Sequence, residues 1–335
     1  MYTRGNTNTR IIVGIYVDDL ILTGEDPKGV ELFKKQIIGE FEMSDLGLLS
    51  YYLGIEVAQF EGGVSIKQTT YAKKVLNQFG MLDCNSTKAP MEHRAQLYKD
   101  PEGHPVDATE YRRVIGCLRY LLHTRPDLSY AVGVVSRFME RPTEIHHKAV
   151  KQVLRYLQGT IHLGLVFRNG GGDEEIVGYS DSDLVGDLDD RKSTGGMAFY
   201  INDSLVSWNS QKQKTMALSS CEAEFMAAAA AACQALWLKS LLFELSGSKP
   251  KAVKLYVDNK SAIVLMKNPV FHGRSKHIDT KYHFIRECVE GSQIKVEFVR
   301  TDEQKADILT KALPASKLVM MRHLIGVRDL EPRQD

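Results

Sequence analysis

Short hydrophobic runs alternate with turn-forming residues in the N-terminal part of the chain. The runs "RIIVGIY" and "LILT" are rich in β-formers and flank two adjacent aspartates, Asp18 and Asp19. This pattern predicts a β-hairpin with both carboxylates at its tip. The next stretch, "EDPKGVELFKKQIIGEF", places apolar residues at helical spacing after the N-cap residue Asp26. It therefore predicts a helix.

Residues 51–157 predict a second hairpin followed by several helices. The runs "YYLGIEV" and "VSIKQ" are joined by two glycines and indicate the hairpin. A helix is predicted from Thr70 to Phe79, and the polar, proline-bearing stretch 88–107 is predicted as a linker. Three more helices are predicted around residues 111–123, 127–139 and 143–157.

The second half of the chain has the pattern of an α/β domain. The stretch "NGGGD" at residues 169–173 marks a boundary. After it we predict strands at 176–180, 196–201 and 205–210, a long helix at 222–245, a strand at 253–257, a helix, a second helix at 279–291, a strand at 294–299 and a last helix at 303–312. Three strands, a helix and then alternating strands and helices predict a mixed sheet.

Length and composition are those of an ordinary globular protein. The chain has 335 residues, of which 43% are hydrophobic and 25% are charged. This is long enough for two or three domains and does not indicate disorder. The net charge of +1 predicts no polyanionic partner by itself, so any nucleic-acid contact depends on how the charges are distributed.

Cysteine spacing and the N-terminus indicate an intracellular protein that is not secreted. The five cysteines never form a C-x-x-C pair, so neither a zinc knuckle nor a disulfide framework is predicted. The N-terminus "MYTRGNTNTR" lacks the apolar core of a signal peptide. The run "FMAAAAAAC" is too short and too weakly apolar to span a bilayer, so we expect no membrane partner.

The hairpin-tip aspartates allow two interpretations. Aspartate suits tight turns and tolerates unusual backbone angles. Two carboxylates at a hairpin tip could also hold Mg²⁺ through oxygen ligands. The basic residues of the predicted helices between 111 and 157 are open in the same way, because they could form a solvated helix face or a stripe that contacts nucleic acid.

Four acidic residues of the second half occupy the ends of predicted elements. Asp181 ends the first strand, Glu224 lies early in the long helix, Asp258 follows the fourth strand and Asp307 lies in the last helix. Such positions can converge in space, and four adjacent carboxylates repel one another unless cations are present. Two Mg²⁺ ions roughly 4 Å apart would relieve the repulsion and could support in-line phosphodiester cleavage.

Neighbouring acidic residues compete with two of these four. Ser219 and Glu222 fit the S-x-x-E capping box, which gives Glu222 a local role at the helix start. Glu224 lies two residues further, about 200° around the helix, and therefore points elsewhere. Asp181 and Asp183 cannot be separated in this way, because a strand period of two places both on one face.

From Ile176 to Pro314 the chain resembles the ribonuclease H domain of copia-type retroelement polyproteins. The resemblance rests on the motifs "SDSDLVGDLDDRKSTGG", "VSWNSQKQKTMALSSCEAEF", "LYVDNKSAI", "SKHIDTKYHFIRE" and "KADILTKALP". It implies a ribonuclease H-like mixed five-stranded sheet with flanking helices. It also implies Mg²⁺-dependent hydrolysis of the RNA strand of an RNA/DNA hybrid.

The family pattern implies a metal site of four acidic residues, which fall on Asp181, Glu224, Asp258 and Asp307. It favours Asp181 over Asp183 as the first ligand. The implied cofactor is a pair of Mg²⁺ ions, for which Mn²⁺ could substitute.

One departure from cellular ribonucleases H lies before the final aspartate. Those enzymes carry a mobile histidine in that loop, whereas the loop here reads "RTDEQKA". His277 and His283 lie earlier in the chain. They could approach the site, although satisfied or surface histidines are the simpler interpretation. Slower or differently assisted turnover is therefore expected to be possible.

Basic and hydroxyl side chains near the site are candidates for hybrid binding. Lys212 and Lys214, with Ser219 and Ser220 at a helix N-terminus, could hold phosphates by charge and by free backbone N–H groups. Arg274, Lys276 and Lys281 form a second cluster. Hybrid recognition would depend on groove shape and 2′-hydroxyl groups, so little sequence preference is expected. Trp208 is interpreted as a core residue.

The N-terminal half resembles the palm and thumb of a copia-type reverse transcriptase. The palm is indicated by "YVDD" and "MSDLGLLSYYLGIEV", and the thumb and connection by "YRRVIGCLRYLLHTRPDLSYAVGVVSRFMERPTEIHHKAVKQVLRYLQGT". This resemblance implies that Asp18 and Asp19 are polymerase metal ligands. The implied domains are a partial α+β palm at 1–90, a helical thumb or connection at 91–168, a ribonuclease H domain at 174–314 and a C-terminal tail at 315–335.

Polymerase activity is not expected of this chain alone. Polymerases of this type need a further aspartate from an earlier palm strand, and no acidic residue precedes Asp18. The incomplete palm is also expected to leave an apolar face uncovered.

The alternative to a nuclease is a non-catalytic nucleic-acid-binding remnant of a degenerate element. The family implies the rest of the Pol polyprotein or element particle as partners. It implies a location in cytoplasmic particles with later nuclear entry.

Overall fold

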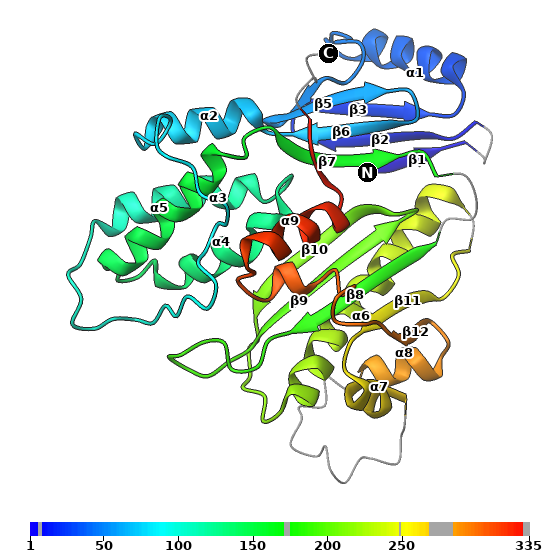
Figure 1. Cartoon of the computed structure of the whole chain (residues 1–335). Coiled ribbons are helices and arrows are strands. Elements are labelled where there is room, and N and C mark those ends of the chain that lie inside the picture. The colour runs from blue at the N-terminus through cyan, green and yellow to red at the C-terminus, as the bar shows by residue number, and fades with distance from the viewer. Residues whose placement is uncertain (6–8, 171–174, 248, 268–283, 331–335) are drawn as a thin grey trace.

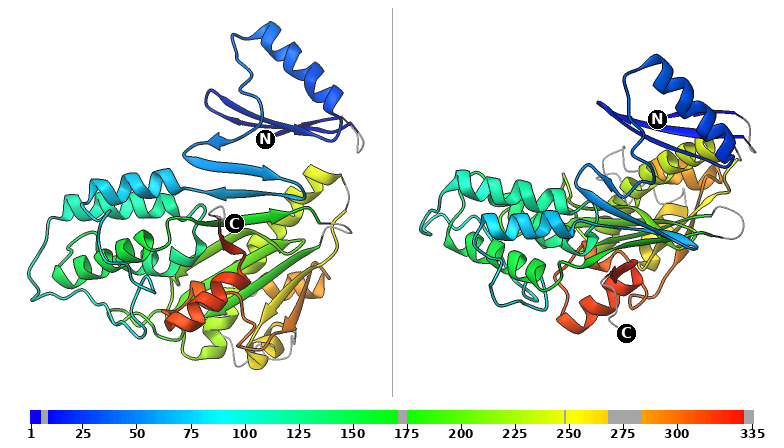
Figure 2. Two further views of the ribbon diagram at one scale, coloured as in Figure 1. Left: turned by 45° about the horizontal axis from the view of Figure 1, so that its top comes forward. Right: turned by 90° about the horizontal axis from the view of Figure 1, so that it is seen from above.

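The computed structural model describes residues 1–5, 9–170, 175–247, 249–267 and 284–330 (Figure 1). Its strands form three sheets, of three, five and five strands. The helical region lies beside the larger mixed sheet, and the N-terminal sheet lies at one end of the molecule (Figures 1 and 2).

The predicted N-terminal hairpin is confirmed. Strands β1 (Tyr2–Arg4), β2 (Ile11–Tyr16) and β3 (Asp19–Gly24) form an antiparallel sheet. Helix α1 (Pro27–Glu40) packs on β3. Its predicted N-cap, Asp26, accepts hydrogen bonds from the backbone N–H groups of Lys28 and Gly29 at 3.0 Å. This cap fixes where the helix begins.

The second predicted hairpin belongs to a sheet assembled from distant segments. Its order is β13-β7-β6-β5-β4. The strands are β4 (Tyr51–Tyr52), β5 (Ile55–Phe60), β6 (Gly63–Lys67), β7 (Leu163–Arg168) and β13 (Val327–Asp329). The sequence did not predict β7 or β13, although the boundary "NGGGD" directly follows β7. Residues 315–330, within the predicted tail, form helix α9 (Ala315–Leu324) and β13.

The predicted helices of the middle region are present, with one difference. They are α2 (Thr69–Gln78), α3 (Ala108–Leu121), η1 (Pro126–Leu128), α4 (Ser129–Val135), η2 (Ser136–Phe138) and α5 (Glu144–Gln158). The helical segment predicted at 127–139 is present at 126–138, but it is not one regular α-helix. It is divided into η1, α4 and η2, because Pro126 starts a 3₁₀ turn and the chain tightens again after Val135.

The five-stranded mixed sheet predicted in the second half is confirmed. Its order is β10-β9-β8-β11-β12. The strands are β8 (Ile176–Ser182), β9 (Thr194–Ile201), β10 (Ser204–Lys212), β11 (Val253–Val257) and β12 (Ile294–Phe298). Strands β8, β9 and β10 pair antiparallel, while β11 is parallel to both β8 and β12.

The two faces of this sheet belong to different hydrophobic clusters. Helices α6 (Ser220–Ser246), α7 (Lys260–Lys267) and α8 (Phe284–Glu290) cover one face. On β9, Phe199 points into that cluster, whereas its neighbours Ala198 and Tyr200 join the helices of the middle region. This alternation follows the strand period of two. The middle region and the sheet therefore share one core.

The run "FMAAAAAAC", predicted to be too short to span a bilayer, is part of the longer helix α6. By length and composition alone, the whole helix is long and apolar enough to cross a membrane. Its most apolar window is 56% buried inside the protein. Ala228, Ala231 and Ala232 pack in the core against the sheet. Burial in a core explains its apolar composition.

The helix predicted at 303–312 is wrong. The segment forms one 3₁₀ turn, η5 (Asp307–Leu309), between irregular residues. Pro314 follows shortly and cannot continue a helix. The turn lies close to the sheet because β9 has a glycine there: a Cβ on Gly196 would approach side-chain atoms of Thr310 and Leu309 to 2.7 and 2.8 Å. This close contact positions Asp307.

Candidate metal centre

Three carboxylates converge near the carboxyl-terminal ends of two inner strands of the mixed sheet. One oxygen from each of Asp181, Glu224 and Asp258 lies within 4.8 Å of the others. Asp181 is on β8 and Asp258 directly follows β11, and these strands are parallel neighbours whose carboxyl ends meet at one edge. Glu224 reaches them from α6, where small side chains such as Ala227 let the helix lie near Gly195 of β9.

Glu224 has one oxygen that accepts no hydrogen bond. Its Oε1 accepts the backbone N–H of Ser182 at 3.1 Å. Its buried Oε2 has no hydrogen-bond partner among the described residues. Burial and the nearby Asp181 and Asp258 raise the pKa of Glu224 to about 10. A buried oxygen without a donor, among like charges, fits a divalent cation.

Asp258 is fixed between a strand and a helix. Strand β11 ends at Val257, and the side chain of Asn259 caps α7 by accepting the N–H of Ala262 at 3.0 Å. The carboxylate of Asp258 accepts the Thr301 hydroxyl at 3.1 Å. Its position therefore depends on both strands of the parallel pair, because Thr301 follows β12.

Asp181 and Asp307 share a lysine. Asp181 is 2% exposed and accepts a hydrogen bond from the Thr310 hydroxyl. Burial raises its pKa. The ammonium Nζ of Lys311 lies 3.5 Å from Asp181 Oδ2 and 2.7 Å from Asp307 Oδ1. Asp307 is thus adjacent to the three-carboxylate group, and Lys311 connects it to Asp181.

The second oxygen of Asp307 meets another lysine. Lys317 Nζ, from α9, lies 2.6 Å from Asp307 Oδ2. The sequence analysis did not single out Lys311, Lys317 or Thr310. The spacing of four residues between Asp307 and Lys311 could have suggested a pair, but such pairs are common on exposed helices and do not point to a metal centre.

Asp183 has a local role that separates it from Asp181. It lies beyond the end of β8, and its Oδ1 accepts the backbone N–H of Thr194. Burial raises its pKa to about 6. Strand β8 ends at Ser182, so the period-two rule that placed both aspartates on one face does not extend to Asp183.

Glu222 acts at the helix start, as the capping pattern indicated. The Ser219 hydroxyl oxygen accepts the Glu222 N–H at 3.2 Å. In return, Glu222 Oε2 accepts the N–H of Leu218 at 2.9 Å, one residue before the cap. Glu222 and Glu224 therefore have different partners on the same helix.

The residues considered for nucleic-acid binding have mixed surroundings. Lys212 Nζ pairs with Asp187 at 2.7 Å and Asp190 at 2.8 Å, so its charge is balanced within the protein. Lys214 and Ser220 are exposed, and Ser219 caps α6. Arg274, Lys276 and Lys281, with His277 and His283, lie outside the described residues.

Basic residues of the middle helices also have structural partners. Arg112 donates to the Met139 carbonyl at 3.1 Å and Arg155 to the Asn85 carbonyl at 2.7 Å. Arg137 pairs with Asp187 at 3.1 Å. These three contacts hold loops on the helices, which accounts for part of the predicted stripe without nucleic acid.

Asp18 and Asp19 lie on an exposed hairpin. Asp19 opens β3 and pairs with Tyr16 across the turn. Among the described residues, neither belongs to a group of three or more metal-ligand side chains.

Comparisons with known proteins add the family. Residues 1–93 match the family described as reverse transcriptase (RNA-dependent DNA polymerase). The chain is 38% identical to the retrovirus-related Pol polyprotein from transposon TNT 1-94 of Nicotiana tabacum, over 97% of this chain and 25% of that protein. It is 30% identical to the putative transposon Ty5-1 protein YCL074W of Saccharomyces cerevisiae, over 68% of this chain and 75% of that protein.

Among solved structures, the N-terminal RNase H domain of rv2228c from Mycobacterium tuberculosis is similar with 15% identity. The match covers 45% of this chain and 98% of that chain with a TM-score of 0.29, which is too low to support the fold. The chain spans about a quarter of the tobacco polyprotein. From the matches along its sequence, the chain belongs to the family of retrovirus-related Pol polyproteins of copia-type transposons.

Proposed function

We propose that this chain hydrolyses the RNA strand of RNA/DNA hybrids with Mg²⁺, for which Mn²⁺ can substitute. The observation that carries the proposal is the convergence of Asp181, Glu224 and Asp258, with one buried oxygen of Glu224 lacking a donor. These three residues would hold a divalent cation, and Asp307 would complete the ligand set beside Asp181. The cations, when bound, would supply charge neutralisation and activation of water for in-line cleavage of a phosphodiester.

The chain's own residues would orient the site before a hybrid binds. The Ser182 N–H fixes one oxygen of Glu224, which leaves the other directed at the neighbouring carboxylates. The Thr301 and Thr310 hydroxyl groups fix Asp258 and Asp181. Ligands held in this way need little rearrangement when a cation enters.

A hybrid-cleavage assay in Mg²⁺ tests the proposal. Asp258→Asn is expected to lower the cleavage rate by more than about 100-fold, since even outer partners of metal ligands contribute about 10- to 100-fold. Asp302→Asn is the matched control, because Asp302 is an exposed aspartate that pairs with Arg300 at 3.1 Å. Wild-type activity in the folded Asp258→Asn variant would refute the assignment.

The rival proposal is a non-catalytic nucleic-acid-binding remnant. One observation favours it: both oxygens of Asp307 already contact lysines. A remnant would bind a labelled RNA/DNA hybrid with a steep salt dependence and would leave it uncut in Mg²⁺ and in Mn²⁺. Cleavage that depends on Asp258 decides against it.

Asp18 and Asp19 are proposed as polymerase-type metal ligands that do not act in this chain alone. Two exposed carboxylates without a third acidic partner among the described residues do not hold a two-ion site. Purified chain is expected not to incorporate labelled dNTP on a primed RNA template. Incorporation that Asp18→Asn abolishes would overturn this proposal.

The partners proposed from the family are the RNA/DNA hybrid and the rest of the Pol polyprotein in an element particle. The corresponding locations are a cytoplasmic particle and the nucleus. Co-sedimentation of the chain with particle RNA in fractionated cells tests this. A chain recovered only in the free protein fraction would contradict it.

A further inference from the structure

Lys311 occupies the position between two proposed metal ligands. Its Nζ contacts Asp307 Oδ1 at 2.7 Å and lies 3.5 Å from Asp181 Oδ2. The two carboxylates are 0% and 2% exposed at their side chains, whereas the lysine side chain is 40% exposed. The ammonium group is therefore positioned between two buried carboxylates and keeps a route to solvent.

The four carboxylates divide into two unequal halves. In one half, Asp181 and Asp307 receive Thr310, Lys311 and Lys317. In the other half, Glu224 keeps an oxygen without a partner among the described residues. The first half therefore already contacts two protein cations, although Asp307 Oδ1 forms an ion pair with Lys311 and no hydrogen bond. The second half has no ion pair with a lysine or arginine among the described residues.

The charge balance of the cluster follows from these contacts. When a cation is bound, all four carboxylates are ionised and carry four negative charges, and the ammonium groups of Lys311 and Lys317 supply two positive charges. One divalent cation balances the remaining two negative charges, whereas a second one would leave two excess positive charges in a buried site, which is costly. Without the Lys311 ammonium, a second ion would leave only one excess positive charge and could occupy the place of that ammonium beside Asp307 Oδ1.

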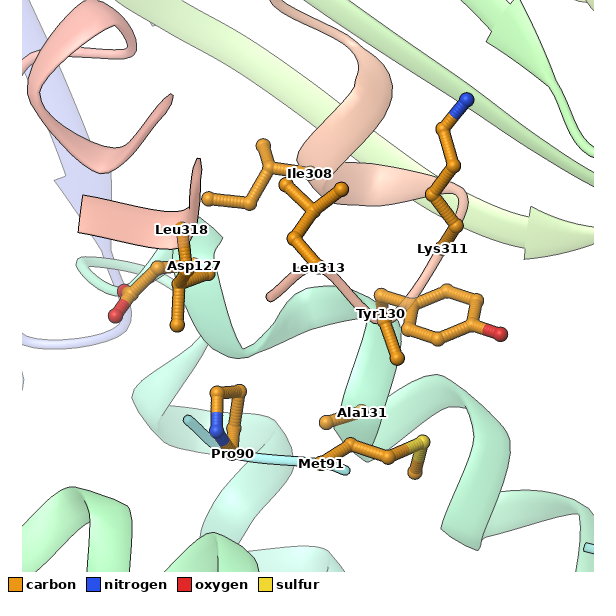
Figure 3. Close-up of a pocket in the computed structure, with 10 residues that line it drawn as sticks. Pro90, Met91, Asp127, Tyr130, Ala131, Ile308, Lys311, Leu313 and Leu318 are labelled. Atoms are coloured by element: carbon orange, nitrogen blue, oxygen red, sulfur yellow. The ribbon is translucent and has the colours of Figure 1, made fainter. Parts of the chain in front are cut away.

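Apolar residues of the middle region lie against the segment that carries Lys311. A small pocket of about 10 Å³ lies between Ile308 and Leu313 on one side and Pro90, Met91 and Ala131 on the other. Figure 3 shows the Lys311 side chain extending away from these apolar groups, with its amine on the far side from the pocket. The apolar contacts thus fix where the lysine starts, and its ammonium reaches the carboxylates.

We propose that Lys311 is a positioning residue that serves as a built-in second cation of the nuclease centre. The site takes one divalent cation at Asp181, Glu224 and Asp258, and a second ion enters only when Lys311 leaves Asp307. This rests on the proposed nuclease function. Lys311 also holds Asp181 and Asp307 together before any ion binds, so their mutual repulsion does not open the site.

Titration of the full chain with Mn²⁺, without substrate, tests the proposal. Calorimetry and the electron paramagnetic resonance signal of free Mn²⁺ both give the number of bound ions. The wild type is expected to bind one ion, and Lys311→Met is expected to bind two. Lys311→Arg keeps the positive charge and is expected to return the number to one. Lys295→Met, at an exposed position of β12, is the control and is expected to bind one ion.

The outcomes separate this proposal from the proposed function. Two ions bound by the wild type, or one ion bound by folded Lys311→Met, would overturn the role of Lys311 and leave the metal centre intact. No bound Mn²⁺ in the wild type, or binding unchanged by Asp258→Asn, would overturn the metal centre itself. Thermal melts of each variant identify those that fail to fold, and Lys311→Gln then replaces Lys311→Met.

Discussion

At the scale of single residues, the carboxylates proposed as metal ligands are partly neutralised within the protein, because Lys311 and Lys317 both contact Asp307. Asp181, Glu224 and Asp258 were chosen by their places at strand ends and on a helix, and the structure brings these three together. The sequence alone does not indicate a role for Lys311 or Lys317, because a lysine a few residues from an aspartate is common. Their meaning depends on which carboxylate they contact in space.

The raised pKa of Glu224 predicts a pH-dependent stability in the metal-free protein. Burial and the adjacent carboxylates raise this pKa from 4.5 to about 10. Between these values the folded state binds more protons than the unfolded state, so stability falls as pH rises, by at most about 1.4 kcal/mol per pH unit. The melting temperature in EDTA is expected to fall from pH 6 to pH 8.

Glu224→Gln removes the titrating group and is expected to flatten this slope. Glu222→Gln, two residues away, keeps an oxygen that can accept the Leu218 N–H, and Glu224 is still present, so the slope should remain. Mg²⁺ should also flatten the slope, because it stabilises the ionised carboxylate. An unchanged slope in Glu224→Gln would show that Glu224 does not titrate in this range.

At the scale of elements, the strongly patterned segments were predicted well. Strand β11 coincides with its predicted range, 253–257, and helices α5 and α6 are close to theirs. The failures have particular causes. The segment predicted as a helix at 303–312 forms only one 3₁₀ turn, because it contacts Gly196 and the sheet closely. Strand β13 pairs with β7, and β7 also pairs with β6, and no local sequence pattern predicts these long-range pairings.

The close contact between Gly196 of β9 and η5 predicts that a larger side chain at this position destabilises the protein. In Gly196→Val, the added carbon atoms would collide with Thr310 and Leu309. We expect a loss of about 1–3 kcal/mol of unfolding free energy, which is typical of overpacking, and a lower rate of hybrid cleavage because Asp307 and Thr310 move. Denaturant melts and the cleavage assay measure the two effects.

The matched control for this substitution is Gly116→Ala in α3. Nothing lies within 4 Å of a Cβ at Gly116. Alanine there is expected to be neutral or to stabilise the helix by up to about 1 kcal/mol. If Gly196→Val melts and cleaves like the control, the turn at 307–309 does not depend on close contact with the sheet.

At the scale of the whole molecule, the middle helices and the mixed sheet share one hydrophobic core. Their common core contains Leu118 and Val132 of the helices, Tyr200 of the sheet, and Ile308 and Leu313 of the segment that carries Asp307. The sequence marked these residues as apolar but could not show which apolar faces meet. The domain limits remain predictions, and the shared core predicts that the proposed metal centre depends on the helices.

A buried ionic network adds to the stability of this shared core. Arg125 and Asp127 pair at 2.8 Å with side chains 3% and 0% exposed. The Tyr156 hydroxyl donates to Asp127 at 2.7 Å, and Arg322 of α9 donates to that hydroxyl at 3.2 Å. Asp127→Ala would leave Arg125 buried without its carboxylate partner, although it would still donate to Thr160. We expect a loss of about 3–5 kcal/mol in unfolding free energy.

Denaturant melts of Asp127→Ala measure this loss. The control is Asp45→Ala, because Asp45 pairs with Lys34 at 2.9 Å on the surface, where the melting temperature should not change. A loss in Asp127→Ala no larger than that of the control would mean that the network does not stabilise the shared core.

The N-terminal sheet is expected to be dispensable for the stability of the shared core. The three hydrophobic clusters contain no described residue before Ile66. Large apolar side chains of the segment between α1 and β4 are uncovered: Leu46 is 92% exposed, Leu48 73% and Phe41 65%. Exposed apolar surface of this kind promotes association. Removal of residues 1–50, which ends before β4, should therefore preserve the melting temperature and hybrid cleavage and reduce aggregation in size-exclusion chromatography. A fall in melting temperature as large as that of Asp127→Ala would show instead that the N-terminal sheet supports the core.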